Sequence, residues 1–221
     1  SQTPALLDSS IDVDGSSLSL IELFDAELQK LNLSPIGDKL DDAARQLGKN
    51  IWLTQAWVLA IGMIGTDRLL RLGHRPDVVL GHSFGECTAA WASGCMSIRD
   101  AIQFAKFRSD AVLMAGNTDG VLLSVRDSVD RVGSILKQAG VDVVVTHLNA
   151  PEQTVVAAAP AQVEQAKAAL AKERIASVVI DVPAAFHTPA MKDAEDQLRA
   201  RFGSSRLRPP TTAYLSAINN R

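Results

Sequence analysis

The feature that most constrains the fold is a short apolar stretch that leads into a glycine-flanked serine. Residues 78–80 read VVL, residues 81–86 read GHSFGE, and helix-forming residues follow at 87–92. A strand, a G-x-S-x-G turn and a helix in this order form a nucleophile elbow, whose tight turn lifts the serine oxygen clear of the backbone. The N–H groups that open the helix point to the place where an oxyanion would form. The pattern predicts a nucleophile at Ser83, although glycine-flanked serines also occur in plain turns.

Composition places the chain among ordinary globular proteins. It has 221 residues, of which 47% are hydrophobic and 21% charged, and its net charge of −3 gives no electrostatic footprint for nucleic acid. Two cysteines and no basic, apolar leader at the start favour a reducing cytoplasm. The longest uncharged stretch, residues 51–66, falls short of the roughly 20 residues that a bilayer span needs. We expect a buried core helix there and no membrane span.

The first 120 residues predict a mainly helical region around the elbow. Residues 1–16 are polar and expected to be loose. Helices are expected from Ser19, over a second stretch from about Leu40 that could merge with the apolar one ending near Gly73, and over residues 98–114. In the first of these helices, one face would carry apolar side chains at Leu20, Phe24, Leu28 and Leu31.

Residues 120–182 follow a different pattern. Strands are expected at residues 121–125, 141–146, 154–157 and 175–182, with helices at 127–138 and 160–172 and a turn at 149–152. The order βαββαβ is that of a ferredoxin-like unit. The predicted fold class is therefore α/β, with a hydrolase-like parallel-sheet lobe (1–119 and 183–221) that carries the nucleophile elbow. A ferredoxin-like α+β subdomain (120–182) is inserted into it, and a cleft between two such lobes is a usual place for a ligand.

A serine nucleophile needs a base, and the chain has four histidines. His82 adjoins Ser83, so its side chain is expected to point away and to pack structurally. His74 lies in a polar loop, and His147 ends a strand as a satisfied hydrogen-bonding group. His187 follows the last strand of the insert, and position alone leaves it either a base or a structural residue. Glu86 and Cys87, in the elbow helix, are expected to be structural.

Four segments resemble a known family. RPDVVLGHSFGE, a helix containing FRSD, NAPEQTVVA and AAFHTPAM occur in the order found in malonyl-CoA:acyl-carrier-protein transacylases, the acyltransferase domains of fatty-acid and polyketide synthases. The resemblance covers roughly Ile51 to Asn219. GHSFGE together with AAFHTP looks most like the domains of polyunsaturated-fatty-acid synthases.

The resemblance implies roles for particular residues. Ser83 matches the acylated serine and His187 the general base and acid. Arg108 matches the arginine that pairs with the malonyl carboxylate, for which a planar guanidinium offers two parallel hydrogen bonds; without the resemblance it would read as a surface charge. The Phe186–His187 pair matches the malonyl-type version, which leaves less room for a 2-methyl branch.

Further residues match substrate-binding positions of the family. The N–H of Phe84 would hold the oxyanion. Gln55 and Asn149 match positions near the active site, where a buried helix amide and a turn residue are the alternatives. His82 matches a position beside the acylated serine.

The implied activity is a ping-pong transfer of a malonyl or related group. It passes from a coenzyme A thioester through the serine ester to the phosphopantetheine thiol of an acyl carrier protein, with no metal or redox cofactor. A serine hydrolase or thioesterase and a non-catalytic docking domain of a synthase remain alternatives. An acidic carrier protein would need a basic docking site, at Arg199, Arg201, Arg206 and Arg208 or at Arg68, Arg71 and Arg75, although ordinary solvated charges are the simpler reading of both groups.

Two segments of the family pattern are not found in the sequence. They are the F-P-G-Q-G opening and the closing segment that would follow TTAYLSAINNR. We expect the chain either to be part of a larger synthase, beside its other domains, or to receive the missing pieces from elsewhere.

Overall fold

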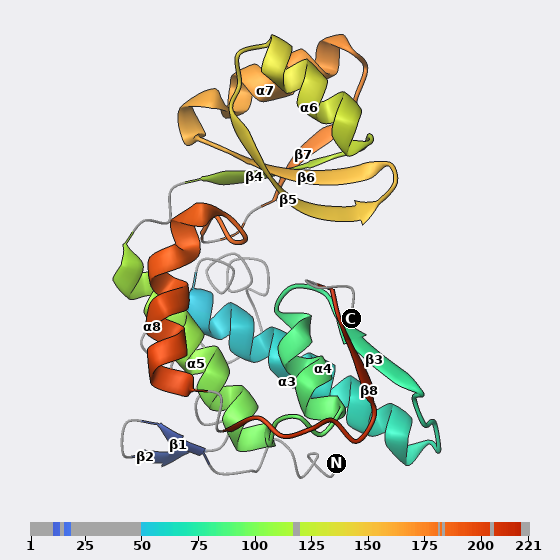
Figure 1. Ribbon diagram of the computed structural model, residues 1–221, viewed down its shortest axis with the longest axis vertical. Helices are drawn as coiled ribbons and strands as arrows, with labels where there is room; N and C mark the ends of the chain where they lie inside the picture. The colour runs from blue at the N-terminus through green and yellow to red at the C-terminus, as the bar shows by residue number, and fades with distance from the viewer. Residues whose placement is uncertain are drawn as a thin grey trace, which may run out of the picture. The chain divides into compact units, whose positions relative to one another are not determined.

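The computed structural model describes residues 11–13, 16–18, 50–116, 120–180, 182, 184–203 and 206–217. The chain divides into two compact units, which are described separately (Figure 1). The first unit comprises residues 1–110 and 197–221, and the second comprises residues 111–196. The helix expected from Ser19 and the start of the one expected from Leu40 lie outside the described residues.

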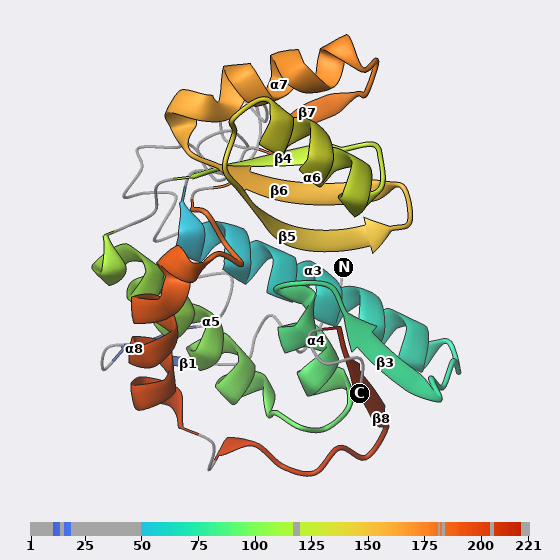
Figure 2. The ribbon, with the colours of Figure 1, turned by 45° about the horizontal axis from the view of Figure 1, so that its top comes forward.

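The first unit combines a small parallel sheet with helices. Its strands β3 (Val78–Gly81) and β8 (Ala213–Ser216) pair in parallel, and Figures 1 and 2 show them side by side next to helix α4 (Gly85–Ala92). A separate antiparallel pair joins β1 (Ile11–Val13) and β2 (Ser16–Leu18). Helix α5 (Ile98–Ala115) begins in this unit, and helix α8 (Lys192–Phe202) ends in it. The parallel strands and the elbow confirm the predicted α/β class.

Helix α3 (Ile51–Arg71) supplies half of the buried residues in the core cluster of the first unit. Asn50 caps its start by accepting a hydrogen bond from the backbone N–H of Leu53 at 3.0 Å. Its buried side chains recur at helical spacing and pack with residues of α4 and α5. They are Trp52, Ala56, Leu59 and Met63. The predicted core helix is thus confirmed, and within the described part of the chain no helix has the length and apolar character to cross a membrane.

The second unit is a four-stranded antiparallel sheet with two helices. In chain order its elements are β4 (Val121–Val125), α6 (Val129–Gln138), β5 (Val143–Ala150), β6 (Gln153–Ala158), α7 (Val163–Lys172) and β7 (Ser177–Ile180). The strand order β5-β6-β4-β7 is that of the predicted ferredoxin-like unit, which is confirmed. Short 3₁₀ turns at Pro160–Gln162 and Pro189–Met191 precede α7 and α8.

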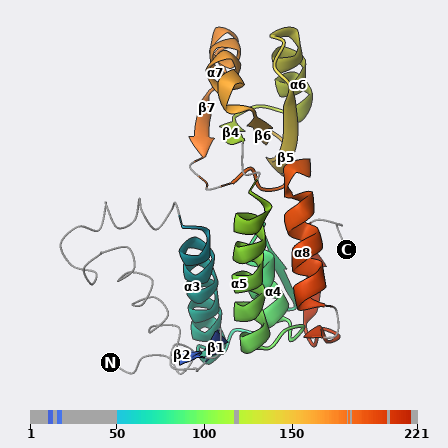
Figure 3. The ribbon, with the colours of Figure 1, turned by 90° about the vertical axis from the view of Figure 1, so that its left-hand side faces the viewer.

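The two faces of this sheet differ. Figure 3 shows α6 and α7 on one face, where alternate strand residues such as Leu123, Val125 and Val156 join the helices in one core. The opposite face has a smaller buried cluster of Leu122, Val155 and Ala157. Strand β5 runs further than expected, to Ala150, so the predicted four-residue turn shortens to residues 151–152.

Candidate active site

Ser83 lies in a strained turn between β3 and α4. Its φ of 52° is in the left-handed region, which costs a non-glycine residue on the order of 1 kcal/mol or more. The N–H of Gly85 donates to the carbonyl of His82 at 2.9 Å, and that of Glu86 donates to the carbonyl of Ser83 at 3.1 Å. The strand therefore turns into the helix within a few residues, as the elbow pattern predicts, and the N–H of Phe84 stays outside this ladder.

The two glycines of the elbow have different physical roles. A Cβ added to Gly81 would lie 2.2 Å from the carbonyl carbon of Gly85 and 2.3 Å from the nitrogen of Glu86, so only glycine fits there. A Cβ added to Gly85 would meet no heavy atom within 4 Å. The first glycine is required by the close approach of the chain to itself, whereas the second faces open space beside Ser83.

Glu86 connects the elbow helix to the end of β8. Its carboxylate accepts hydrogen bonds from the N–H of Ala217 at 2.9 Å, the hydroxyl of Tyr214 at 3.1 Å and that of Ser216 at 3.4 Å. Burial and the neighbouring carboxylate raise the pKa of Tyr214 well above its usual range. The structural role expected for Glu86 is confirmed.

Arg108, on α5, is a partly buried residue whose guanidinium lies beside the start of the elbow helix. Burial lowers the pKa of its guanidinium to about 10, so the group remains charged at neutral pH. Burial also raises the pKa of the Cys87 thiol to about 12, despite the opposing charge of Arg108. Cys87 is therefore an uncharged, buried thiol, as the sequence analysis expected.

Gln55 and Phe84 hold the Arg108 side chain from two sides. Gln55 on α3 is buried, and in the amide orientation that satisfies its hydrogen bonds Oε1 accepts from Nη1 of Arg108 at 2.7 Å. Its Nε2 then donates to the carbonyl of Ala105 at 3.2 Å. The guanidinium carbon of Arg108 lies 5.5 Å from the centroid of the Phe84 ring, a cation–π contact. Within the first unit, Arg108 therefore contacts both Gln55 and Phe84, and Phe84 directly follows Ser83 in the chain.

His82 does not fit the expected packing role. Its side chain is exposed at the end of β3, immediately before the strained serine. The packing role expected from the sequence is wrong on this point, because the residue lies at the surface.

In the second unit, Phe186 and His187 lie in a tight turn. The N–H of Phe186 donates to the carbonyl of Ala184 at 2.8 Å, and the Thr188 hydroxyl donates to the carbonyl of Ala185 at 2.7 Å. His187 has a φ of 63°, so it is, like Ser83, a non-glycine residue held in the left-handed region. The described part of the second unit therefore holds this histidine in a strained conformation.

His147 lies next to His187. The ring centroids are 4.6 Å apart, with an interplanar angle of 74°. Nδ1 of His147 lies 3.0 Å from the hydroxyl oxygen of Thr146, which confirms the expected hydrogen-bonding role. Sequence reasoning missed the contact with His187, and the only signal was the Thr–His pair in a strand otherwise rich in valine. Asn149 is exposed near the end of β5, at a register shift against β6.

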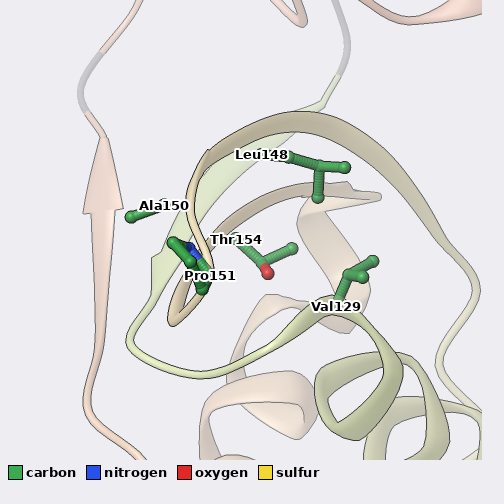
Figure 4. Close-up of a pocket in the computed structure, with 5 residues that line it drawn as sticks. All are labelled: Val129, Leu148, Ala150, Pro151 and Thr154. Atoms are coloured by element: carbon green, nitrogen blue, oxygen red, sulfur yellow. The ribbon is translucent and has the colours of Figure 1, made fainter.

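A surface pocket of the second unit, with a volume of about 290 Å³, lies at the turn between β5 and β6 (Figure 4). Its lining is Val129, Leu148, Ala150, Pro151 and Thr154. Thr154 also donates to the carbonyl of Asp127 at 3.0 Å. None of these side chains ionises near neutral pH, and Leu148 points to the sheet face opposite that of His147. The lining of the pocket therefore supplies no acid or base.

The basic residues near the C-terminus are partly neutralised within the first unit. Arg201 lies 3.4 Å from Asp110 and over the Phe107 ring. Arg206 binds Gln103 and lies 3.9 Å from Asp100. Among the described residues, no group of three or more histidine, cysteine, aspartate or glutamate side chains is placed to hold a metal ion.

These features define an α/β protein with a serine on a strained strand-to-helix turn and a partly buried arginine beside the same helix. A family model described as an acyl transferase domain matches residues 26–221, and the chain belongs to this family.

Relatives and solved structures agree with the assignment. The chain is 31% identical over 173 residues to "Polyketide synthase 2" of Metarhizium robertsii, covering 77% of this chain and 7% of that protein. The acyltransferase domain from the second module of the salinomycin polyketide synthase is 30% identical with a TM-score of 0.68, covering 77% of this chain and 40% of that one. Malonyl-CoA:acyl carrier protein transacylase from Xanthomonas oryzae pv. oryzae is 28% identical with a TM-score of 0.66, covering 75% and 55%. This chain therefore spans a small part of the curated relative and about half of the solved chains.

Proposed function

We propose that the chain transfers a malonyl group from coenzyme A to the phosphopantetheine thiol of an acyl carrier protein, through an ester on Ser83. Family membership supports acyl transfer in general, and "Polyketide synthase 2" and the Xanthomonas oryzae transacylase support the setting and the substrate class. The observation that carries the malonyl assignment is the buried Arg108 guanidinium, which Gln55 and Phe84 hold beside the elbow.

In the proposed mechanism, His187 takes the hydroxyl proton of Ser83 as the serine oxygen attacks the thioester carbonyl. The N–H of Phe84 donates to the oxyanion of the tetrahedral intermediate. The C–S bond then breaks, and His187 returns the proton to the departing coenzyme A thiolate. The carrier thiol reverses these steps and regenerates the serine hydroxyl. The chemistry calls for no metal or redox cofactor.

Arg108 explains why a charged acyl group would be preferred. A carboxylate that enters a partly buried site loses hydration, and a guanidinium that is already desolvated compensates by forming two charge-assisted hydrogen bonds. Gln55 uses Nη1 and so leaves other N–H donors of the guanidinium for the substrate. Phe186, adjacent to His187, would limit the space for a 2-methyl branch. Asn149 and His82 complete the proposed substrate-binding set.

The proposed partners are an acidic acyl carrier protein and the other domains of a synthase, in the cytoplasm. Of the two candidate docking groups, Arg201 and Arg206 are engaged with α5, and Arg71 pairs with Asp67 at 2.6 Å. Arg75 donates to the carbonyls of Leu70 and His74 at 2.7 Å. The other members of those groups are Arg68, Arg199 and Arg208.

Acyl labelling tests the proposal. The protein would be incubated with malonyl-CoA and analysed by mass spectrometry, and a holo carrier protein would then be added. We expect a malonyl adduct on Ser83 that the carrier removes, no adduct in Ser83→Ala, and strongly slowed labelling in His187→Ala. Rapid hydrolysis of neutral esters without transfer would indicate a hydrolase. An unmodified Ser83 would indicate a non-catalytic docking domain.

A further inference from the structure

Strand β5 carries a β-bulge that decides which face of the sheet His147 occupies. Val145 pairs with Val156, and the next pair joins His147 to Val155, so Thr146 is an extra residue. One inserted residue reverses the faces of the side chains that follow it. Val156 belongs to the core under the helices, whereas Val155 belongs to the cluster on the opposite face. The bulge therefore places His147 on the face away from α6 and α7.

The extra residue also favours one tautomer of the ring. The Thr146 hydroxyl donates to the carbonyl of Val155 at 3.2 Å. A hydroxyl has a single proton, so its oxygen is placed to accept from Nδ1–H of His147, whose Nδ1 lies 3.0 Å away. This arrangement favours the neutral ring that carries its proton on Nδ1.

We infer that His147 is a positioning residue for His187, an inference that rests on the proposed function in which His187 moves the proton. The edge of one imidazole meets the face of the other, with centroids 4.6 Å apart and planes at 74°. Such packing sets the partly positive edge of one ring on the negative face of the other and restricts rotation. Thr146 holds His147, and His147 in turn restrains His187.

The consequence for the reaction is geometric. His187 is an exposed residue on a turn, so the rings and side chains that touch its imidazole matter for its orientation. Proton transfer requires one ring nitrogen to point at the serine oxygen, and a displacement of about 1 Å lowers rates by about 10²-fold. A second ring in edge-to-face contact removes part of this freedom before the substrate arrives.

The test compares substitutions of His147 and Thr146. In single-turnover acylation by malonyl-CoA, His147→Ala should lower the rate constant by about tenfold without changing the KM for malonyl-CoA. His147→Phe keeps a ring and should recover part of the rate. Thr146→Ser keeps the hydroxyl and should match the wild type, whereas Thr146→Val should fall between the two. His74→Ala, an exposed histidine of the first unit, is the matched control.

Nitrogen NMR of the imidazole rings gives a readout that does not depend on activity. We expect the wild-type His147 ring to be protonated on Nδ1, and Thr146→Val to lose this preference. Thermal unfolding verifies that each variant is folded, and if His147→Ala is not, His147→Phe and Thr146→Val decide the outcome.

The results separate this inference from the proposed function. Wild-type acylation rates in both His147→Ala and Thr146→Val, or a His147 proton on Nε2, would overturn the positioning role alone, provided that His187→Ala is inactive. A wild-type protein without acyl-Ser83, or a fully active His187→Ala, would overturn the proposed function and this inference with it.

Discussion

The contact between Arg108 and Gln55 fixes one charged side chain, to which the proposed function assigns the choice of substrate. Under that proposal, Arg108→Ala removes the partner of the malonyl carboxylate, so the ratio of malonyl to acetyl transfer should fall by an amount equivalent to about 2–4 kcal/mol. Arg108→Lys keeps the charge but loses the planar pair of donors, and it should lie between the alanine variant and the wild type. Competition between the two labelled thioesters measures the ratio. An unchanged ratio in Arg108→Ala would remove Arg108 from the site.

Arg108 and its hydrogen-bond partner Gln55 should lower the free energy of unfolding of the protein. Burial lowers the pKa of Arg108 to about 10, so the unfolded chain binds this proton more tightly than the folded one. The charged form therefore destabilises the fold at every pH below about 10, and the penalty fades as the pH rises from there. Replacing both partners, in Gln55→Leu/Arg108→Met, should raise the free energy of unfolding at pH 7 by about 1–3 kcal/mol. Urea titration measures the free energy of unfolding. A large decrease in the double variant would contradict a destabilising role for the charged Arg108.

The sequence indicates candidate residues for the site but not the contacts between them. The strained φ of Ser83 follows from G-x-S-x-G, because that pattern specifies a local backbone path. The bond from Gln55 to Arg108 joins two different helices and depends on how they pack, for which neither local sequence carries a signal. The contact of His147 with His187 depends on a bulge that inserts only one residue.

In the elbow, the backbone at Gly81 lies close to the backbone of Gly85 and Glu86. The two glycines of the turn should therefore differ in their tolerance of substitution. Gly81→Ala would place a Cβ 2.2 Å from the backbone of Gly85, and the displacement of α4 should destabilise the protein by about 3 kcal/mol or more. Gly85→Ala meets open space, so its stability should stay within about 0.5 kcal/mol of the wild type.

Equilibrium unfolding of the two variants in urea gives the comparison. If Gly85→Ala folds normally and yet acylates slowly, the open space beside Ser83 belongs to the substrate. Equal stabilities for the two variants would show that the turn is looser than its geometry implies.

Hydrophobic periodicity was sufficient to place most elements within a few residues. Helix α6 begins at Val129 against an expected 127, and β5 and β6 form the expected hairpin. The predicted bounds are wrong where contacts with another element determine where a strand ends. Strand β5 continues to Ala150 because Ala150 still pairs with Gln153 of β6. The turn-forming residues Asn149 and Pro151 predict an earlier end of the strand. The attachment of β8 to the elbow through Glu86 likewise joins residues far apart in the chain.

The division of the chain into two units has a thermodynamic counterpart that can be measured. The core of the first unit uses residues of α3, α4 and α5, and the main core of the second unit uses residues between Leu123 and Ile175. Each core is thus built from one unit, so each should lose its structure with some independence. The sequence-based boundaries at residues 120 and 182 stay a prediction that the same measurement addresses.

Leu170→Ala provides the test, because Leu170 is fully buried in the second unit. Its truncation should cost about 2–5 kcal/mol there and speed amide exchange across α6, α7 and the sheet. The three tryptophans, Trp52, Trp57 and Trp91, all belong to the first unit, so the tryptophan fluorescence transition should move little. Leu59 is buried in the first unit. Leu59→Ala should therefore shift the tryptophan fluorescence transition and change amide exchange in the second unit little.

An acylation assay connects the amide-exchange measurement with the fluorescence measurement. Ser83 belongs to the first unit and His187 to the second, so the proposed transfer needs both folded. As Leu170→Ala is warmed, acylation should therefore fail with the exchange-detected transition of the second unit, while the fluorescence of the first unit is still native. A single transition that shifts equally in both probes and in both variants would instead mean that the two cores unfold as one, and that the serine and the histidine cannot be separated thermodynamically.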